Sequence, residues 1–280
     1  MNRPRHRTRL LALIPAALAL AVTAPPALAD SSLSSNWSGY AVHRGGVSFR
    51  KVTATWREPS AACRAGSPSF SAIWVGLGGF SLSSGALEQI GTEVDCSKSG
   101  SVVSSAWYEL VPSPSMPVHL TPKPGDTMQA SVSVAGHRVT LRLIDRTRHK
   151  SFVRTVSVAK ADLGSAEWIV EAPSQCTNLD CRTLPLADFG SVPFASASAV
   201  TAAGRRGSIS SRRWSATKIT LALDARHYVS ARAPAAATPS GLQKSGAAFS
   251  VAFAPVSGGP GQPAFSPRRA SATSAAARRR

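Results

Sequence analysis

Apolar and polar residues alternate with a period of two through the middle of the chain. The clearest runs are residues 51–56, 131–134 and 138–143, in which every second residue is apolar. This spacing is typical of β-strands with one buried and one exposed face. Turn signals such as KPGD at residues 123–126 separate the runs at short intervals. The pattern therefore predicts antiparallel strands joined by tight turns, and not alternating strands and helices.

The composition favours a single all-β domain. The 280 residues include 21 Gly and 20 Pro, and 43% of the chain is hydrophobic. Such frequent Gly and Pro leave no convincing helix of more than two turns, whereas the apolar fraction suffices for one large core. A single all-β domain of about 200–250 residues is normal at this length. We expect an antiparallel sandwich or barrel.

The two ends of the chain differ from its middle. An arginine-rich start is followed by an apolar run, residues 10–22, which is too short for a membrane span, and then by Ala27-Leu28-Ala29. Residues 1–29 are therefore predicted to be a secretory signal, and the protein to be secreted, extracellular and free of membrane. From residue 256 onward Gly, Pro, Ser, Ala and Arg dominate, which predicts a disordered basic tail over 256–280 and a domain over 30–255.

The positive charge of the chain is concentrated at its ends. The formal net charge is +18, and half of it lies in the arginines of the signal and the tail. The only dense basic group elsewhere has no alternating aromatic residues on which bases could stack. We therefore expect a solvated basic loop and no nucleic-acid partner. We also expect the protein to be a monomer. That basic group consists of Arg205, Arg206, Arg212 and Arg213.

The four cysteines predict two disulfides, because the chain carries an export signal. Of the three possible connectivities, local pairing is preferred, with Cys176 bonded to Cys181 and Cys63 bonded to Cys96. A zinc site is the competing use of cysteine. The sequence contains no CxxC or HExxH motif and its histidines are scattered, so we expect no metal and no other cofactor.

Candidate catalytic groups are polar residues inside predicted strands. The chain has no GxSxG elbow, no pepsin-type Asp-Thr-Gly, and no phosphate-binding glycine loop. Three strands instead place carboxylates or amides on one face among tryptophans, as in a polar cleft. By spacing alone these could be solvated surface residues or the paired acids of a glycosidase. The residues that share a face within each strand are Gln89 with Glu93, Trp107 with Glu109, and Glu167 with Glu171.

Six ordered segments resemble the signature blocks of the glutamic peptidases, also called eqolisins. The resemblance runs from about residue 34 to residue 253. Six blocks in the right order are specific, whereas each block alone would be weak. The segments are SNWSGY (35–40), VTATWREPS (52–60), IWVGLGG (73–79), LEQIGTEVD (87–95), AWYELVP (106–112) and AEWIVEAPS (166–174).

The resemblance implies an antiparallel β-sandwich of two packed sheets, of the concanavalin or lectin-like kind. It also implies a secreted endopeptidase that hydrolyses protein or peptide substrates at acid pH by a Gln/Glu dyad. The family glutamine corresponds to Gln89 and the family glutamate to Glu171. The substrate-binding residues of the cleft correspond to Trp74, Trp107 and Glu109.

The chemistry of amide hydrolysis suits these two residues. With a reference pKa of roughly 4.3, Glu171 would be partly ionised in acid and could take a proton from water and return it to the leaving amine. The amide of Gln89 could donate to the oxyanion. Two positions depart from the family pattern, because Gly78 and Ser105 stand where the family has aspartates. These departures concern supporting hydrogen bonds or subsite charge, so we expect them to affect specificity and pH optimum more than the reaction.

A secreted, non-catalytic, carbohydrate-binding module of lectin-like fold is the alternative function. The presence of both Gln89 and Glu171 favours the enzyme, because a binding module has no need of that pair. Among the other residues of the blocks, we expect Glu93 and Glu109 to raise the pKa of Glu171, and Glu167 to form a surface pair.

Four further residues of the blocks are expected to pack in the core. Trp37, Trp56 and Trp168 are predicted to be core residues. Asn36 begins the glycosylation sequon Asn-Trp-Ser, but it lies inside a family block and is interpreted as part of a packing motif.

Overall fold

The computed structural model describes residues 30–81, 83–177, 180–222 and 235–254. All regular elements among these residues are β-strands, as the Gly and Pro content predicted. Within the described part of the chain, no helix has the length and hydropathy to span a membrane. The predicted signal and tail lie outside the described residues, so both boundaries of the domain stay predictions.

Eighteen strands make up the described fold. Their bounds are β1 Asp30–Ser34, β2 Trp37–His43, β3 Phe49–Arg57, β4 Ala72–Gly78, β5 Leu87–Cys96, β6 Val102–Val111, β7 Met116–Val118, β8 Thr127–Ala135, β9 Arg138–Asp145, β10 Lys150–Ser157, β11 Ser165–Glu171, β12 Ser174–Thr177, β13 Asp180–Thr183, β14 Ser191–Thr201, β15 Arg206–Gly207, β16 Ser215–Ala222, β17 Ala235–Pro239 and β18 Phe249–Phe253.

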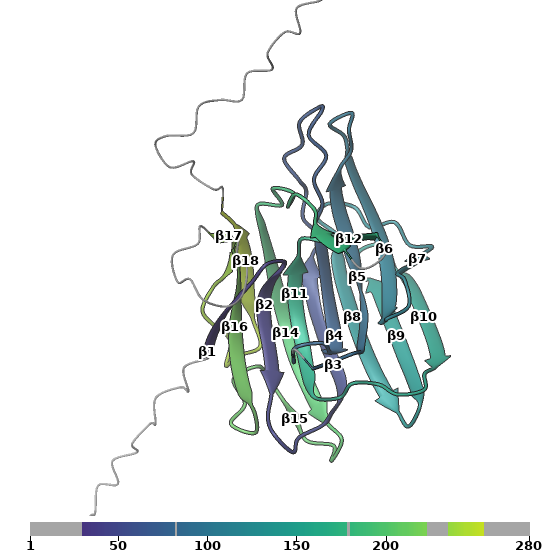
Figure 1. The fold of residues 1–280 in the computed structure, drawn as a ribbon, viewed down its shortest axis with the longest axis vertical. Helices are drawn as coiled ribbons and strands as arrows, with labels where there is room; N and C mark the ends of the chain where they lie inside the picture. Colours follow the sequence, from purple (N-terminus) through teal and green to yellow (C-terminus); the bar gives the residue numbers. More distant parts are fainter. Residues whose placement is uncertain (1–29, 82, 178–179, 223–234, 255–280) are drawn as a thin grey trace, which may run out of the picture.

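The strands form a two-layered antiparallel sandwich. The front layer runs in the order β16-β2-β11-β4-β5-β6-β7, and the back layer runs β10-β9-β8-β3-β14-β18. Strands β3 and β8 of the back layer pack against β4 and β5 of the front layer. The predicted sandwich is confirmed, with one addition: β17 joins β18 to β16, so the two layers are one continuous hydrogen-bonded sheet (Figure 1). Among the strands of the described residues, only β1 pairs in parallel, with β16. Strands β12 and β13 pair in a separate hairpin.

The core between the layers follows the predicted alternation. In β3, Val52, Ala54 and Trp56 are buried, and the residues between them are half-buried on the outer face. Trp168 of β11 enters the same core from the front layer and donates its indole N–H to the carbonyl of Thr53 at 2.9 Å. Each large apolar side chain buried in this way contributes about 1.5–3 kcal/mol.

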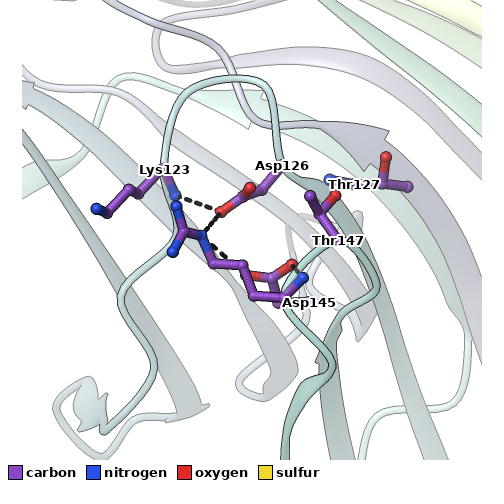
Figure 2. Close-up of polar contacts among 6 residues, drawn as sticks. Lys123, Asp126, Thr127, Asp145 and Thr147 are labelled. Carbon is purple, nitrogen blue, oxygen red and sulfur yellow. Dashed lines mark hydrogen bonds and ion pairs between the residues drawn. The ribbon is translucent and has the colours of Figure 1, made fainter.

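One ion-pair cluster ties the start of β8 to the turn after β9. Asp126 Oδ2 accepts 2.8 Å hydrogen bonds from the backbone N–H of Lys123 and from Nε of Arg148 (Figure 2). The same Arg148 nitrogen lies 4.0 Å from Oδ2 of Asp145. These are the only ion pairs among the described residues. The other buried carboxyl groups of the described fold therefore have no cationic partner.

The disulfide Cys63–Cys96 is confirmed, and it links the segment after β3 to the end of β5. Cys181 is also disulfide-bonded. It lies opposite Cys176 in the register of the β12–β13 hairpin. The side chain of Cys176 lies outside the described part of the structure, so the pairing of Cys176 with Cys181 stays a prediction.

Candidate active site

One face of the front layer carries the polar residues that the sequence placed together. Gln89 of β5 lies directly opposite Glu109 of β6, and Glu93 lies opposite Ser105. On the far side of β4, Glu171 of β11 pairs with Ala72. The predicted alternation is confirmed for all three strands, because neighbouring residues such as Ile90, Tyr108 and Trp168 belong to the core on the opposite side of the layer.

A hollow of about 620 Å³ opens on this face. Its lining includes Gln89, Glu109 and Glu171 from the sheet, and Asn36 and Trp37 from the start of β2. We refer to this hollow as the cleft. The carboxyl of Glu171 on β11 and the amide of Gln89 on β5 thus line the same cleft. Only β4 lies between these two strands.

Glu171 is held at the cleft by two hydrogen bonds. Its Oε1 accepts from Nδ2 of Asn36 at 2.9 Å, and its Oε2 accepts from Nε1 of Trp74 at 2.8 Å. Burial raises the pKa of Glu171 to about 7. The indoles of Trp74 and Trp37 and the amide of Asn36 oppose this shift, and the Glu109 charge adds to it. The reference value assumed from the sequence is therefore too low.

Gln89 is almost fully buried, with 4% of its surface exposed. Its Nε2 donates a 2.6 Å hydrogen bond to Oε2 of Glu109, and its Oε1 has no hydrogen-bond partner. Burial raises the pKa of Glu109, with a further contribution from the Glu93 charge, while the bond from Gln89 lowers it. Burial also raises the pKa of Glu93, whose Oε2 accepts from Ser105 at 3.0 Å.

A glycine makes room for the aromatic floor of the cleft. Trp74, Gly91 and Trp107 form one cross-strand row on β4, β5 and β6. A Cβ added at Gly91 would lie 2.7 Å from Cβ of Trp74 and 2.1 Å from the carbonyl oxygen of Ile73, so no larger residue fits there without a shift. The missing side chain leaves room for the Cα and Cβ of Trp74, whose indole N–H donates to Glu171.

Comparisons with known proteins identify the family of the chain. Residues 35–233 match the sequence model of the peptidase A4 family. The chain belongs to the peptidase A4 family. As a member of this family it is an acid-acting glutamic endopeptidase. A sequence search of curated proteins finds no match.

Several solved structures are similar to this peptidase. A scytalido-glutamic peptidase with a transition state analog inhibitor has 25% sequence identity and a TM-score of 0.65, with 79% of this chain and 98% of that chain covered. SCP-B, an eqolisin in complex with the tripeptide Ala-Ile-His, has 24% identity and a TM-score of 0.62, with the same coverage. Aspergilloglutamic peptidase from Aspergillus niger has 24% identity and a TM-score of 0.51, covering 66% of this chain and 99% of that chain.

The tryptophans of the peptidase divide differently from the sequence prediction. Trp56 and Trp168 are core residues, as predicted. Trp37 is not in the core: it lines the cleft and meets Trp74 edge-to-face, with ring centroids 5.0 Å apart. Trp74 and Trp107 are buried beneath the cleft in a small apolar cluster on the outer side of the front layer. Of the three predicted substrate-binding residues, Glu109 alone lines the hollow.

Two polar residues of the peptidase have surroundings that sequence reasoning missed. Asn36, interpreted as part of a packing motif, bonds directly to Glu171. Glu167, expected to form a surface pair, is fully buried, and neither of its carboxyl oxygens has a hydrogen-bond partner. Burial raises the pKa of Glu167 well above its ordinary value, so the group is neutral in acid. The surface-pair expectation is wrong, because Glu167 packs between β2 and β4 and not at an edge.

Within the described ranges, no three His, Cys, Asp or Glu side chains gather so as to hold a metal ion.

Proposed function

We propose that the chain is a secreted endopeptidase that cuts protein or peptide substrates in the cleft by a Gln89/Glu171 dyad. One observation carries this proposal: the carboxyl of Glu171 and the amide of Gln89 line the same hollow from strands on either side of β4. The similar solved structures support the class of ligand, since one holds a peptide-based transition state analog and another holds a tripeptide.

Glu171 would serve as base and then as acid. Its ionised form takes a proton from a water molecule, and the water oxygen attacks the carbonyl carbon of the scissile amide. The same proton then passes to the leaving nitrogen, so the C–N bond breaks and Glu171 returns to its ionised form. Such proton transfers are typically worth about 10²–10⁴ in rate.

Gln89 would stabilise the negative charge on the carbonyl oxygen. A side-chain amide has two N–H donors, and in Gln89 one of them bonds to Glu109. The second N–H remains for the oxyanion. One such donor commonly contributes about 10²–10³ in kcat.

The raised pKa of Glu171 governs the pH dependence of this scheme. With a pKa of about 7, the ionised form is the minor one in acid. At pH 4 it amounts to roughly one molecule in 10³, although a base of higher pKa is also a stronger one. We therefore expect kcat/KM to rise with pH on the acid side of its optimum.

The export and the processing of the chain form the second part of the proposal. The arginine-rich start, apolar run and small-residue site of residues 1–29 support removal of a signal and secretion. The domain would then occupy residues 30–255, act as a monomer, and leave the basic segment 256–280 outside the fold.

The dyad is tested by peptide hydrolysis at pH 3–6 with purified variants. Glu171→Gln preserves shape but removes the base, so hydrolysis should fall to background. Gln89→Ala should lose at least about 10²-fold in kcat with a smaller change in KM, because the oxyanion bond strengthens in the transition state. Circular dichroism checks that each variant is folded.

Two matched variants complete the test. Glu167→Gln alters a carboxyl of the same strand that is neutral in acid, and Gln129→Ala alters a strand glutamine on the outer face of the back layer. Both should retain near-normal hydrolysis. Normal activity in Glu171→Gln would overturn the dyad, and a wild-type protein that binds sugars but hydrolyses no peptide would establish the binding-module alternative.

A further inference from the structure

The last residue of β4 has no side chain, and the space for one is occupied by a different segment. Gly78 has φ of +83°, in the left-handed region that favours glycine. A Cβ at this position would lie 2.6 Å from Cβ of Asp162 and 2.8 Å from its carbonyl oxygen. Asp162 belongs to the segment between β10 and β11. Its backbone and side chain therefore fill the position beside β4 where the family pattern has an aspartate and this chain has Gly78.

The Asp162 carboxylate binds the segment that follows Gly78. Its Oδ2 accepts a hydrogen bond from the backbone N–H of Gly79 at 3.4 Å and contacts the hydroxyl of Ser84. Its Oδ1 accepts from the backbone N–H of Gly164 at 2.8 Å, which fixes the carboxylate on its own segment. One side chain thus joins two segments that are far apart in sequence.

The segment held by Asp162 forms a wall of the cleft. We call residues 79–81 and 83–86 the rim loop. Gly79, Phe80, Ser81 and Ser84 of the rim loop line the cleft together with Gln89 and Glu171. Phe80 stacks on His43 with ring centroids 4.7 Å apart, which anchors the other side of the loop. The position of this wall therefore depends on two contacts, one aromatic and one through Asp162.

We propose that Asp162 is a positioning residue for substrate binding, which holds the rim loop against the peptide in the cleft. The inference rests on the proposed function only in taking a peptide as the ligand of the cleft. Asp162 is absent from the cleft lining and does not bond to Gln89 or Glu171. Its loss should therefore weaken binding while leaving the chemical step intact.

The test separates KM from kcat in Asp162→Asn. In Asp162 both carboxylate oxygens accept hydrogen bonds, whereas the asparagine amide has only one accepting oxygen. The variant therefore loses at least one of the bonds from Gly79, Ser84 and Gly164, and the rim loop is held less firmly. We expect KM to rise roughly 10-fold, with kcat changed less than about 3-fold. The matched control is Asp188→Asn, because Asp188 Oδ1 makes the same kind of turn bond to Gly190 at 3.1 Å but lines no part of the cleft. The control should keep both constants.

A double-mutant cycle distinguishes positioning from general destabilisation. If Asp162 acts through Ser84, the variant with both Asp162→Asn and Ser84→Ala should bind no more weakly than Asp162→Asn alone. Independent, additive losses in KM would overturn the proposal, and so would an unchanged KM in Asp162→Asn. If Asp162→Asn fails to fold, Ser84→Ala alone should raise KM several-fold. An unchanged KM in Ser84→Ala would also overturn the proposal.

Binding without turnover keeps this test apart from that of the dyad. A fluorescent peptide is titrated into Glu171→Gln protein with and without Asp162→Asn. If the protein with both Glu171→Gln and Asp162→Asn has a Kd roughly 10-fold higher than Glu171→Gln alone, the role of Asp162 is supported, whichever residue performs the chemistry. Equal Kd values would overturn that role and leave the dyad untouched.

Discussion

The side-chain amide of Gln89 donates a 2.6 Å hydrogen bond to the carboxyl of Glu109 across the β5–β6 pair. In its ionised form the Glu109 carboxyl only accepts hydrogen bonds, so this contact then determines which end of the amide carries the nitrogen. The oxygen of the amide is left buried and without a partner. Glu109 therefore sets the direction in which the remaining N–H of Gln89 points.

The first prediction concerns this orientation. In Glu109→Gln, the new side chain can both donate and accept, so Gln89 is no longer held with its nitrogen toward β6. We expect kcat to fall about 10-fold with little change in KM, because the effect is on a donor used in the transition state. Glu93→Gln leaves the Gln89 contact in place and should have near-normal kcat. An unchanged kcat in Glu109→Gln, from steady-state hydrolysis at pH 4–5, would show that this bond does not orient Gln89.

A second prediction follows from the bond between Trp74 and Glu171. Because that bond lowers the pKa of Glu171 against the effect of burial, Trp74→Phe should raise the pKa. The acid limb of kcat/KM should then move to higher pH, with activity at pH 4 reduced roughly five-fold. Trp107→Phe is the matched control, since the Trp107 indole nitrogen is buried in the same cluster without a partner. Equal profiles for both variants would contradict the assignment of the acid limb to Glu171.

The third prediction is a loss of stability as the pH rises. Glu58 is buried, its Oε2 accepts from Trp56 and Thr92, and burial raises its pKa to about 8. A carboxyl with a raised folded pKa stabilises the fold fully below its unfolded pKa of about 4.5, and this contribution disappears as the pH passes through about 8. Urea midpoints should therefore fall between pH 4.5 and 8.

Glu58→Gln tests the contribution of this one group. The amide cannot ionise, so the variant should be more stable than the wild type at pH 8, by on the order of a few kcal/mol at most, and close to it at pH 4.5. Parallel pH curves for the two proteins would assign the loss to other groups. Burial also raises the pKa of the buried Glu88 and of the half-buried Asp95 to about 7.

The fourth prediction concerns the cysteines. Peptide mapping without reduction should recover Cys63 linked to Cys96, and Cys176 linked to Cys181. The first pair is bonded in the structure, and the second is opposed in the β12–β13 register. Recovery of Cys176 as a free thiol, or of any peptide that joins Cys181 to Cys63 or Cys96, would be inconsistent with this pairing.

The sequence predicts the faces of the strands well, because alternation depends only on the local pleat. The alternation alone predicts that Gln89, Glu109 and Glu171 each lie on the polar face of their strand. The register brings these three polar faces to one side of the front layer. The joining of the two layers through β17 was not predictable, since strand order depends on contacts far apart in sequence.

Burial of individual residues was harder to predict than strand face. Trp37 was assigned to the core because most large aromatic residues are buried, but it begins its strand at the cleft. Glu167 was assigned to the surface because carboxyls are rarely buried without a partner, and here one is. The contact of Asn36 with Glu171 carried no local signal, because it joins residues 135 positions apart.

The floor of the cleft is built from β2, β11, β4, β5 and β6, which are successive neighbours in one sheet. Glu171 and Gln89 lie on strands two spacings apart, about 10 Å across the sheet. The register also offsets them by four residues along β4, because Glu171 pairs with Ala72 and Gln89 pairs with Gly76, so the hydrogen-bond ladder fixes their relative position. No hinge between lobes has to close for the carboxyl and the amide to face each other, so the loss of chain entropy that brings them together occurs once, when the protein folds. On heating, the carboxyl and the amide are therefore expected to keep their relative position until the sheet itself unfolds.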